Sequence, residues 1–251
     1  ATVLVWSGME PASVDLGPLL DLAGDAGNLR REIVETVRVN ARLGIPVYGL
    51  AGILAELAAG RPVIVLQNFG AGWFPRWHYA VAVGYDLERE DLYLHTGTRG
   101  WRPTRFGPFE FSWVRGGSWA LVVLTPDRLP AGASLADSLD AADGLERAGK
   151  FAAAAATYEA IAQRWPGGAA ALMGLGRNRH ALGDLAGAEA ALRKAIEAAP
   201  EAAAPAWNDL AYVLAGLGRR AAALDAARAA IALGGENIED YSETLEWLSR
   251  R

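Results

Sequence analysis

The stretch ALGDLAGAEAALRKAIEAAP, from Ala181 to Pro200, decides the fold of the second half of this 251-residue chain. Gly183 separates two helical patterns, and Pro200 ends the second of them, which is rich in alanine. The same frame recurs around Gly149, 34 residues earlier, and around Gly218, 35 residues later. The sequence therefore predicts a helix–turn–helix unit that repeats with a period of 34 to 35 residues.

The repeated unit resembles the tetratricopeptide repeat family in its period, in its glycine turns and in the small residues where helices would cross. Pro166 and Pro200 stand at the ends of the first two copies, as proline does in that family. The resemblance implies an all-α solenoid over residues 135–251, with three repeats and a capping helix over Glu236–Arg250. It also implies a protein partner that binds the concave face of the repeats.

The first half of the chain has a different composition and contains most of the aromatic and β-branched residues. Residues 1–126 are expected to form an α+β domain, in which helices precede a small antiparallel sheet. Residues 127–134, which include Pro130 and Gly132, are expected to form a linker. The predicted helices are Val14–Leu22, Asn28–Leu43 and Ala51–Ala59, and the predicted strands are Val63–Gln67, Trp77–Tyr85, Leu92–Thr96 and Ser118–Leu124.

Composition and charge exclude several classes of protein. The net charge is −5, with 12 basic and 13 acidic residues through position 130 and 12 and 16 after it, so no nucleic-acid partner is expected. The absence of cysteine excludes disulfides and thiolate metal sites, and the three histidines lack the spacing of a zinc site. No cofactor is expected, and no apolar run reaches the roughly 18 residues of a membrane span. The basic and aromatic stretch Arg99–Arg105 is expected to be a solvated turn region, and the alternative is a contact with a substrate chain.

A histidine near the start of a predicted strand is the main catalytic candidate. The stretch FPRWHYAVAVGYD, from Phe74 to Asp86, is largely apolar and places His78 between Trp77 and Tyr79. Imidazole suits a general base because its ordinary pKa lies close to operating pH. The alternative for His78 is an ordinary half-buried strand residue that is hydrogen-bonded to a neighbouring carbonyl.

Arg61–Leu66 and His78–Asp86 together resemble the histidine region of the bacteriocin-processing (double-glycine leader) cysteine peptidases, which have a papain-like fold. Ala1–Gly8 looks like the continuation of the helix that carries the nucleophilic cysteine in that family, with Gly8 as its cap. The resemblance covers residues 1–126. It implies a papain-like domain that is truncated at its N-terminus, with the cysteine upstream of Ala1.

By this resemblance, His78 would be the general base of a thiol peptidase that acts on a peptide or protein substrate. The orienting aspartate of the family falls at Thr96, a neutral group that can orient the imidazole but cannot stabilise its cation as a carboxylate does. Because the chain has no cysteine, we expect it to be inactive in thiol proteolysis. The alternative is an inactive peptidase fold that binds peptides or acts as a scaffold. A bacterial cytoplasmic location and a periplasmic or lipid-anchored one both remain open.

The predicted hairpin sets a geometric expectation for His78. Residues Thr96–Thr98 would lie opposite His78, and strand alternation would place His78, Ala80 and Ala82 on one face of the sheet. The imidazole should then point towards the start of the Ala1–Trp6 helix, ahead of which the nucleophile of the family would lie.

Overall fold

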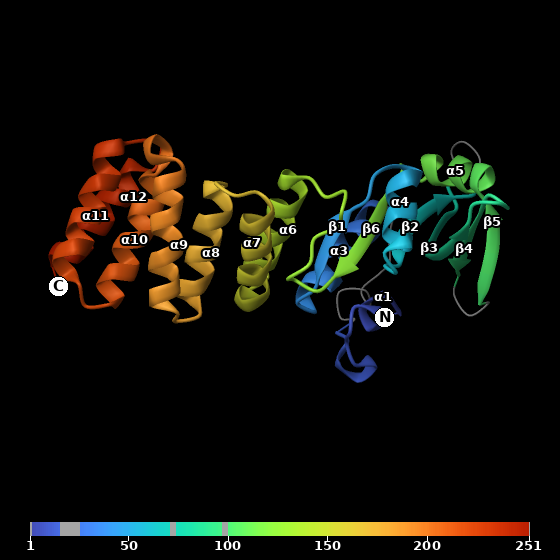
Figure 1. Cartoon of the computed structure of the whole chain (residues 1–251), viewed down its shortest axis with the longest axis horizontal. Coiled ribbons are helices and arrows are strands. Elements are labelled where there is room, and N and C mark those ends of the chain that lie inside the picture. Colours follow the sequence, from blue (N-terminus) through green and yellow to red (C-terminus); the bar gives the residue numbers. More distant parts are fainter. Residues whose placement is uncertain (1, 16–25, 71–73, 97–99, 251) are drawn as a thin grey trace. The chain divides into compact units, whose positions relative to one another are not determined.

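The computed structural model describes residues 2–15, 26–70, 74–96 and 100–250 (Figure 1). The chain divides into two compact units, Ala1–Ala141 and Ala142–Arg251. The division falls within helix α6 (Leu135–Arg147), and therefore after the predicted linker at 127–134. Most of the predicted helix Val14–Leu22 lies outside the described residues.

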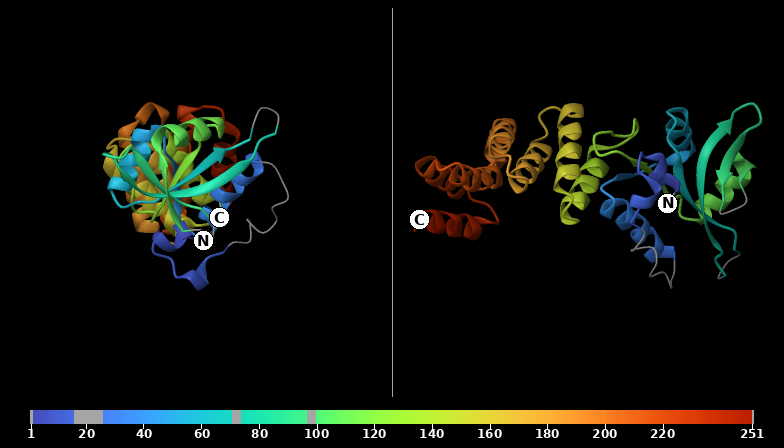
Figure 2. Two further views of the ribbon diagram at one scale, coloured as in Figure 1. Left: turned by 90° about the vertical axis from the view of Figure 1, so that its right-hand side faces the viewer. Right: turned by 90° about the horizontal axis from the view of Figure 1, so that it is seen from below.

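The first unit is built around a six-stranded antiparallel sheet with the strand order β1-β6-β2-β3-β4-β5. Its strands are β1 (Leu43–Pro46), β2 (Val63–Asn68), β3 (Trp77–Asp86), β4 (Asp91–His95), β5 (Trp101–Arg105) and β6 (Ala120–Leu124). The predicted strands that correspond to β2, β3, β4 and β6 are confirmed, with ends that differ by at most two residues. The strands fan out with the twist that is usual for a sheet (Figure 2).

Helices α1 (Thr2–Trp6) and α3 (Ala26–Val39) pack on one face of this sheet. They share a hydrophobic cluster with the strands. Its members from the helices are Val3, Leu4, Ile33, Val34 and Val37, and its members from the strands are Ile64, Val81, Leu121 and Val123. This side of the sheet is called the α1 face below. The predicted cap of α1 is confirmed, because Gly8 has a positive φ of 88° and its N–H donates to the carbonyl of Val5.

Helix α3 ends four residues earlier than the predicted helix Asn28–Leu43. Ala41 has a positive φ of 51°, and the N–H of Arg42 donates to the carbonyl of Val37 at 3.0 Å. This pattern closes a helix with a left-handed residue after its last turn. Leu43, which was predicted to be helical, therefore begins strand β1 instead.

The sequence prediction missed strand β5 and helix α5 (Phe106–Arg115). The prediction of a turn region over Arg99–Arg105 is wrong for residues 101–105. These residues form β5, which pairs with β4 from Asp91↔Arg105 to His95↔Trp101. Helix α5 packs against β2, where Gln67 Nε2 donates to Ser112 Oγ at 2.8 Å. Helix α4 (Gly49–Ala58), which packs against β2 and β3, confirms the predicted helix Ala51–Ala59 within two residues.

The second unit consists of antiparallel helix pairs (Figures 1 and 2). After α6, which begins in the first unit, its helices are α7 (Phe151–Arg164), α8 (Ala169–Ala181), α9 (Leu185–Ala198), α10 (Ala204–Gly216), α11 (Arg220–Leu233) and α12 (Ile238–Ser249). The turns within the pairs contain Gly149, Gly183 and Gly218, whose φ values of 69°, 81° and 74° suit glycine. In the part of the chain that the structure describes, no helix is long and apolar enough to cross a membrane.

Candidate functional site

A charged network crosses the first helices of the three pairs in the second unit. Glu146 lies on α6, Arg177 on α8 and Asp209 on α10. Arg177 Nε lies 3.2 Å from Glu146 Oε1, and Arg177 Nη1 lies 4.0 Å from Asp209 Oδ2. Glu146 Oε2 also accepts hydrogen bonds from Asn178 Nδ2 at 3.0 Å and from the Tyr158 hydroxyl at 3.1 Å. The network therefore connects all three repeats through side chains.

Burial and charge have opposite effects on the two carboxylates of this network. Burial raises the pKa of Asp209 to about 6, and the nearby guanidinium of Arg177 offsets this only in part. Burial also acts to raise the pKa of Glu146, but the hydrogen bonds and charge of Arg177, with the bonds from Asn178 and Tyr158, outweigh it and lower that pKa. Glu146 is therefore the more firmly ionised partner of Arg177.

Two adjacent cavities open beside the network. The smaller, of about 210 Å³, is lined by Arg177, His180, Asp209 and Tyr212 together with apolar neighbours. The larger, of about 360 Å³, shares His180 and Tyr212 with the smaller one and also has Trp247 of α12 in its wall. The rest of its lining includes three residues with little or no side chain, which are Ala215, Gly216 and Gly218.

Two aromatic rings form one wall of the larger cavity. The ring centroids of Tyr212 and Trp247 lie 5.4 Å apart at an interplanar angle of 40°, a tilted arrangement. The Tyr212 hydroxyl lies 3.0 Å from Thr244 Oγ1, which holds its ring against α12. We call the surface formed by Arg177, His180, Asp209, Tyr212 and Trp247 the first-helix surface, because α8, α10 and α12 provide its side chains.

The first-helix surface is suited to binding a segment of another molecule. It combines a cavity with aromatic walls, which can take an apolar side chain, and charged and hydrogen-bonding groups at its edge, which can fix orientation. Within the described ranges, no group of three or more histidine, aspartate and glutamate side chains could hold a metal ion.

In the first unit, His78 lies near the start of β3 and pairs with Gln67 of β2. Its ring centroid lies 5.7 Å from that of Phe69, at an interplanar angle of 46°. The neighbouring pairs are Ala80 with Val65 and Ala82 with Val63, so His78 shares a face with both alanines. The predicted alternation along this strand is therefore confirmed.

The predicted direction of the imidazole is wrong. Val81, which lies between Ala80 and Ala82, belongs to the cluster that packs against α1. Because side chains alternate along a strand, His78 lies on the opposite face of the sheet from α1. The Tyr79 ring supports this assignment, since it contacts Trp119 of the same cluster edge-on at 5.8 Å.

Thr96 follows the last residue of β4. The described pairing between β3 and β4 ends at Val81↔His95, and residues 97 and 98, which were also expected opposite His78, lie outside the described residues. Among the described residues, no hydrogen bond joins His78 to Thr96. The catalytic roles of His78 and Thr96 remain proposals.

Comparison with known proteins identifies the repeats. Residues 139–203 match the model of the tetratricopeptide repeat family. The chain contains tetratricopeptide repeats. The family model covers most of the first pair and all of the second pair and supports the predicted repeats there, whereas no comparison supports a papain-like domain over residues 1–126. No curated protein sequence matches the chain.

Solved structures that match part of the chain include tetratricopeptide domains and a secretion chaperone. The TPR2B domain of yeast Sti1, in a complex with pHsp70, is 18% identical with a TM-score of 0.44, and the match covers 46% of this chain and 96% of that one. The type III secretion translocator chaperone SycD of Yersinia enterocolitica is 21% identical with a TM-score of 0.44, covering 47% and 95%. The Sgt2 TPR domain of Aspergillus fumigatus is 17% identical with a TM-score of 0.43, covering 46% and 77%.

His180 was expected from the sequence to be a packing or surface residue on the first helix of the second repeat, and it lines both cavities. The other residues of the first-helix surface were not singled out, although the tetratricopeptide period contains a signal for them. Asp143, Arg177 and Tyr212 are separated by 34 and 35 residues, so they occupy one position in successive repeats. That position lies on the first helix of each pair, where these three copies are polar or aromatic. A comparison of the repeats position by position would have found part of the site.

Proposed function

We propose that this protein binds a segment of a partner protein along the first-helix surface of its tetratricopeptide repeats. A role of the repeats in protein–protein interaction is the general function of the family that matches residues 139–203. The observation that supports this particular surface is the pair of adjacent cavities, of about 210 and 360 Å³, which share His180 and Tyr212. An apolar side chain of the partner would enter the larger cavity and pack against the wall formed by Tyr212 and Trp247.

A displayed library of random peptides, selected on the whole chain, tests this proposal. Recovered peptides should bind the Tyr212→Ala variant at least about ten times more weakly, because aromatic side chains in interface cavities dominate binding. The Tyr212→Phe variant should keep most of the affinity, since it retains the ring and loses only the hydroxyl contact with Thr244. The control is Leu233→Ala at the end of α11, an apolar residue that is 42% exposed on the second helix of the third pair. Equal binding to all three variants would refute the proposal.

A peptidase-like role of residues 1–126, with His78 as the base and Thr96 as the orienting residue, stays a second proposal. His78 lies on the face of the sheet opposite α1, and this position favours the alternative to catalysis, in which the first unit binds peptides without cleaving them. Incubation of this chain with candidate peptides should show no turnover that depends on His78, because the chain has no cysteine. Turnover that is lost in His78→Ala would reveal another nucleophile and would contradict the thiol mechanism.

A further inference from the structure

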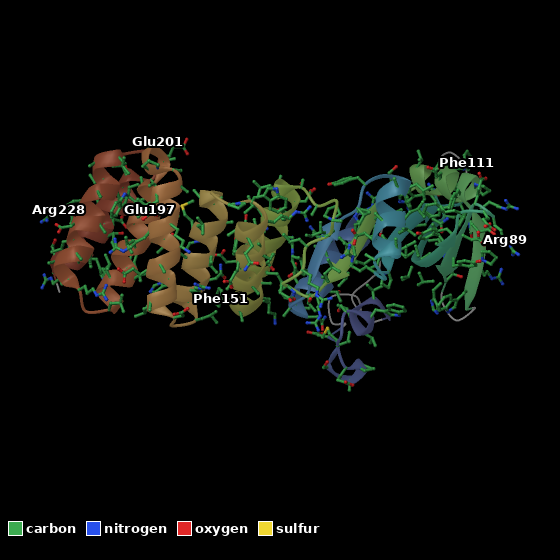
Figure 3. All side chains as sticks on the ribbon, viewed as in Figure 1. Arg89, Phe111, Phe151, Glu197, Glu201 and Arg228 are labelled. Carbon is green, nitrogen blue, oxygen red and sulfur yellow. The ribbon has the colours of Figure 1, made fainter. Side chains whose placement is uncertain are left out.

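Helix α5 of the first unit is apolar on two sides. Phe109, Ser112 and Trp113 are buried beneath it, yet Phe111 and Val114 are 66% and 60% exposed. Phe111 projects from the outer side of the helix (Figure 3). Surface helices are usually polar on the side away from the core, and a helix that is apolar all round usually has a second partner.

A loop with more exposed aromatic residues lies beside α5. Asn68 Oδ1 accepts hydrogen bonds from the N–H groups of Gly70 and Arg76, both at 2.9 Å, and the N–H of Phe69 donates to the carbonyl of Arg76 at 2.9 Å. These bonds fix the two ends of the loop. Phe69 and Phe74 are nevertheless 56% and 76% exposed. Phe69 and Phe74 are therefore held at the surface instead of being buried.

Arg115 joins the helix to this loop. Its guanidinium donates to the carbonyl of Gly70, and its Cζ lies 5.3 Å from the centroid of the Phe111 ring, in cation–π range. Asn68 Nδ2 in turn donates to the carbonyl of Arg115 at 3.5 Å. We call the surface formed by Phe69, Phe74, Phe111, Val114 and Arg115 the α5 surface. Single exposed apolar residues need no explanation, but four that share one hydrogen-bonded frame indicate an interaction site.

We propose that the α5 surface binds an apolar segment of a partner protein that also carries acidic side chains. The charges on this surface favour an acidic partner over a basic one. Arg76 is exposed in the loop, and Arg115 is the last residue of α5. The acidic residue of this helix is Glu110. A carboxylate of the partner would lie near the two arginines while its apolar side chains cover Phe111 and Val114.

The test uses random 16-residue peptides displayed on phage and selected on the whole chain, and the recovered peptides are then synthesised with a fluorescent label. Peptides that bind the α5 surface should combine apolar residues with aspartate or glutamate. Their affinity should fall at least about tenfold for Phe111→Ser, because the Phe111 ring is 66% exposed and available to a partner. It should fall about three- to fivefold for Arg76→Glu, which reverses one exposed charge. The control is Leu87→Ser, an apolar residue that is 62% exposed elsewhere in the first unit and should leave affinity unchanged.

The outcomes separate this proposal from that for the repeats. If every recovered peptide loses affinity for Tyr212→Ala and none for Phe111→Ser, the α5 surface is not a peptide site, while the proposed function of the repeats stands. Recovery of lysine-rich peptides that bind Arg76→Glu as well as the wild type would overturn the charge argument. Sedimentation velocity tests for a second copy of this chain as the occupant, because a dimer that dissociates in Phe111→Ser would also overturn the proposal.

Discussion

Replacing Gly174 with alanine tests how closely the helices of the second unit pack. Gly174 lies in α8, and a Cβ at this position would lie 2.4 Å from Cε1 and Cζ of the Tyr158 ring on α7. Carbon atoms in contact lie about 3.5 to 4.0 Å apart, so the ring or the helix must move by about 1 Å. The ring has little free space, since Tyr158 is 1% exposed and its hydroxyl is hydrogen-bonded to the carboxylates of Asp143 and Glu146.

Two opposing effects determine how much Gly174→Ala changes the free energy of unfolding. Alanine favours the helix over glycine by about 1 kcal/mol. Overpacking of a close-packed core costs about 1 to 3 kcal/mol, and weakening of the hydrogen bonding of the Tyr158 hydroxyl to Asp143 and Glu146 costs about 1 kcal/mol more. Gly174→Ala should therefore lower the free energy of unfolding by about 1 to 3 kcal/mol. In a unit of about 100 residues, this corresponds to a fall in Tm of roughly 5 to 20 °C.

Thermal unfolding followed by far-ultraviolet circular dichroism measures this change. The matched control is Gly216→Ala at the end of α10, where the nearest atom to the new Cβ is Cδ1 of Leu185 at 3.1 Å. A leucine methyl group can move by a few tenths of an ångström, so the Tm of this variant should stay close to that of the wild type. If Gly174→Ala is as stable as Gly216→Ala, the packing of α7 against α8 is looser than the structure shows and the reasoning fails.

Three other predictions concern the charged network, the loop and the division into units. Burial raises the pKa of Asp209 from 3.8 to about 6, so the folded state binds a proton at this carboxylate more tightly than the unfolded state does. Proton binding therefore stabilises the fold at acid pH, and this stabilisation is lost as the pH rises from about 4 to about 6. The difference in Tm between Asp209→Asn and the wild type should therefore be more positive at pH 7 than at pH 4. The same difference at both pH values would contradict this prediction. Asn68→Ala should speed amide hydrogen exchange at Gly70 and Arg76, whose N–H groups it leaves without their acceptor, and unchanged protection would show that Asn68 does not fix the loop. Cleavage at a protease site inserted at 127–134 should release a folded, helical C-terminal piece, whereas an unfolded piece would show that the two units share a core.

The repeats could be predicted from the sequence because their signals are local and recur. Each turn needs a residue that tolerates positive φ, and glycine meets this need at Gly149, Gly183 and Gly218. The small residues between these turns also predict where the helices cross. Ala188 and Ala223, which occupy one position in successive repeats, are both 0% exposed, as expected for sites where helices cross. A period that repeats these constraints three times leaves few other folds for the second half of the chain.

The missed elements of the first unit depend on contacts between distant residues. Strand β5 contains Pro103 and few apolar residues, so its pattern resembles a loop. It is stabilised by its neighbour, since Arg105 Nε lies 3.4 Å from Asp91 Oδ1 across the strand pair. Helix α5 begins directly after it and contains Gly107 and Pro108, which obscure the helical pattern. Neither element has a periodic signal of its own, so the sequence alone did not predict them.

His78 shows which part of a site a strand pattern can predict and which part it cannot. Alternation correctly groups His78 with Ala80 and Ala82, because successive side chains of any strand point to opposite faces of the sheet. The helix that covers each face depends instead on which side chains the helices bury, and α1 packs against Val81 on the other face. A nucleophile carried ahead of α1 would therefore have to pass the edge of the sheet to reach the imidazole. The exposed ring of Phe69, which belongs to the α5 surface, contacts the imidazole of His78. His78 therefore lies beside the surface that we propose binds a partner, on the face of the sheet opposite α1.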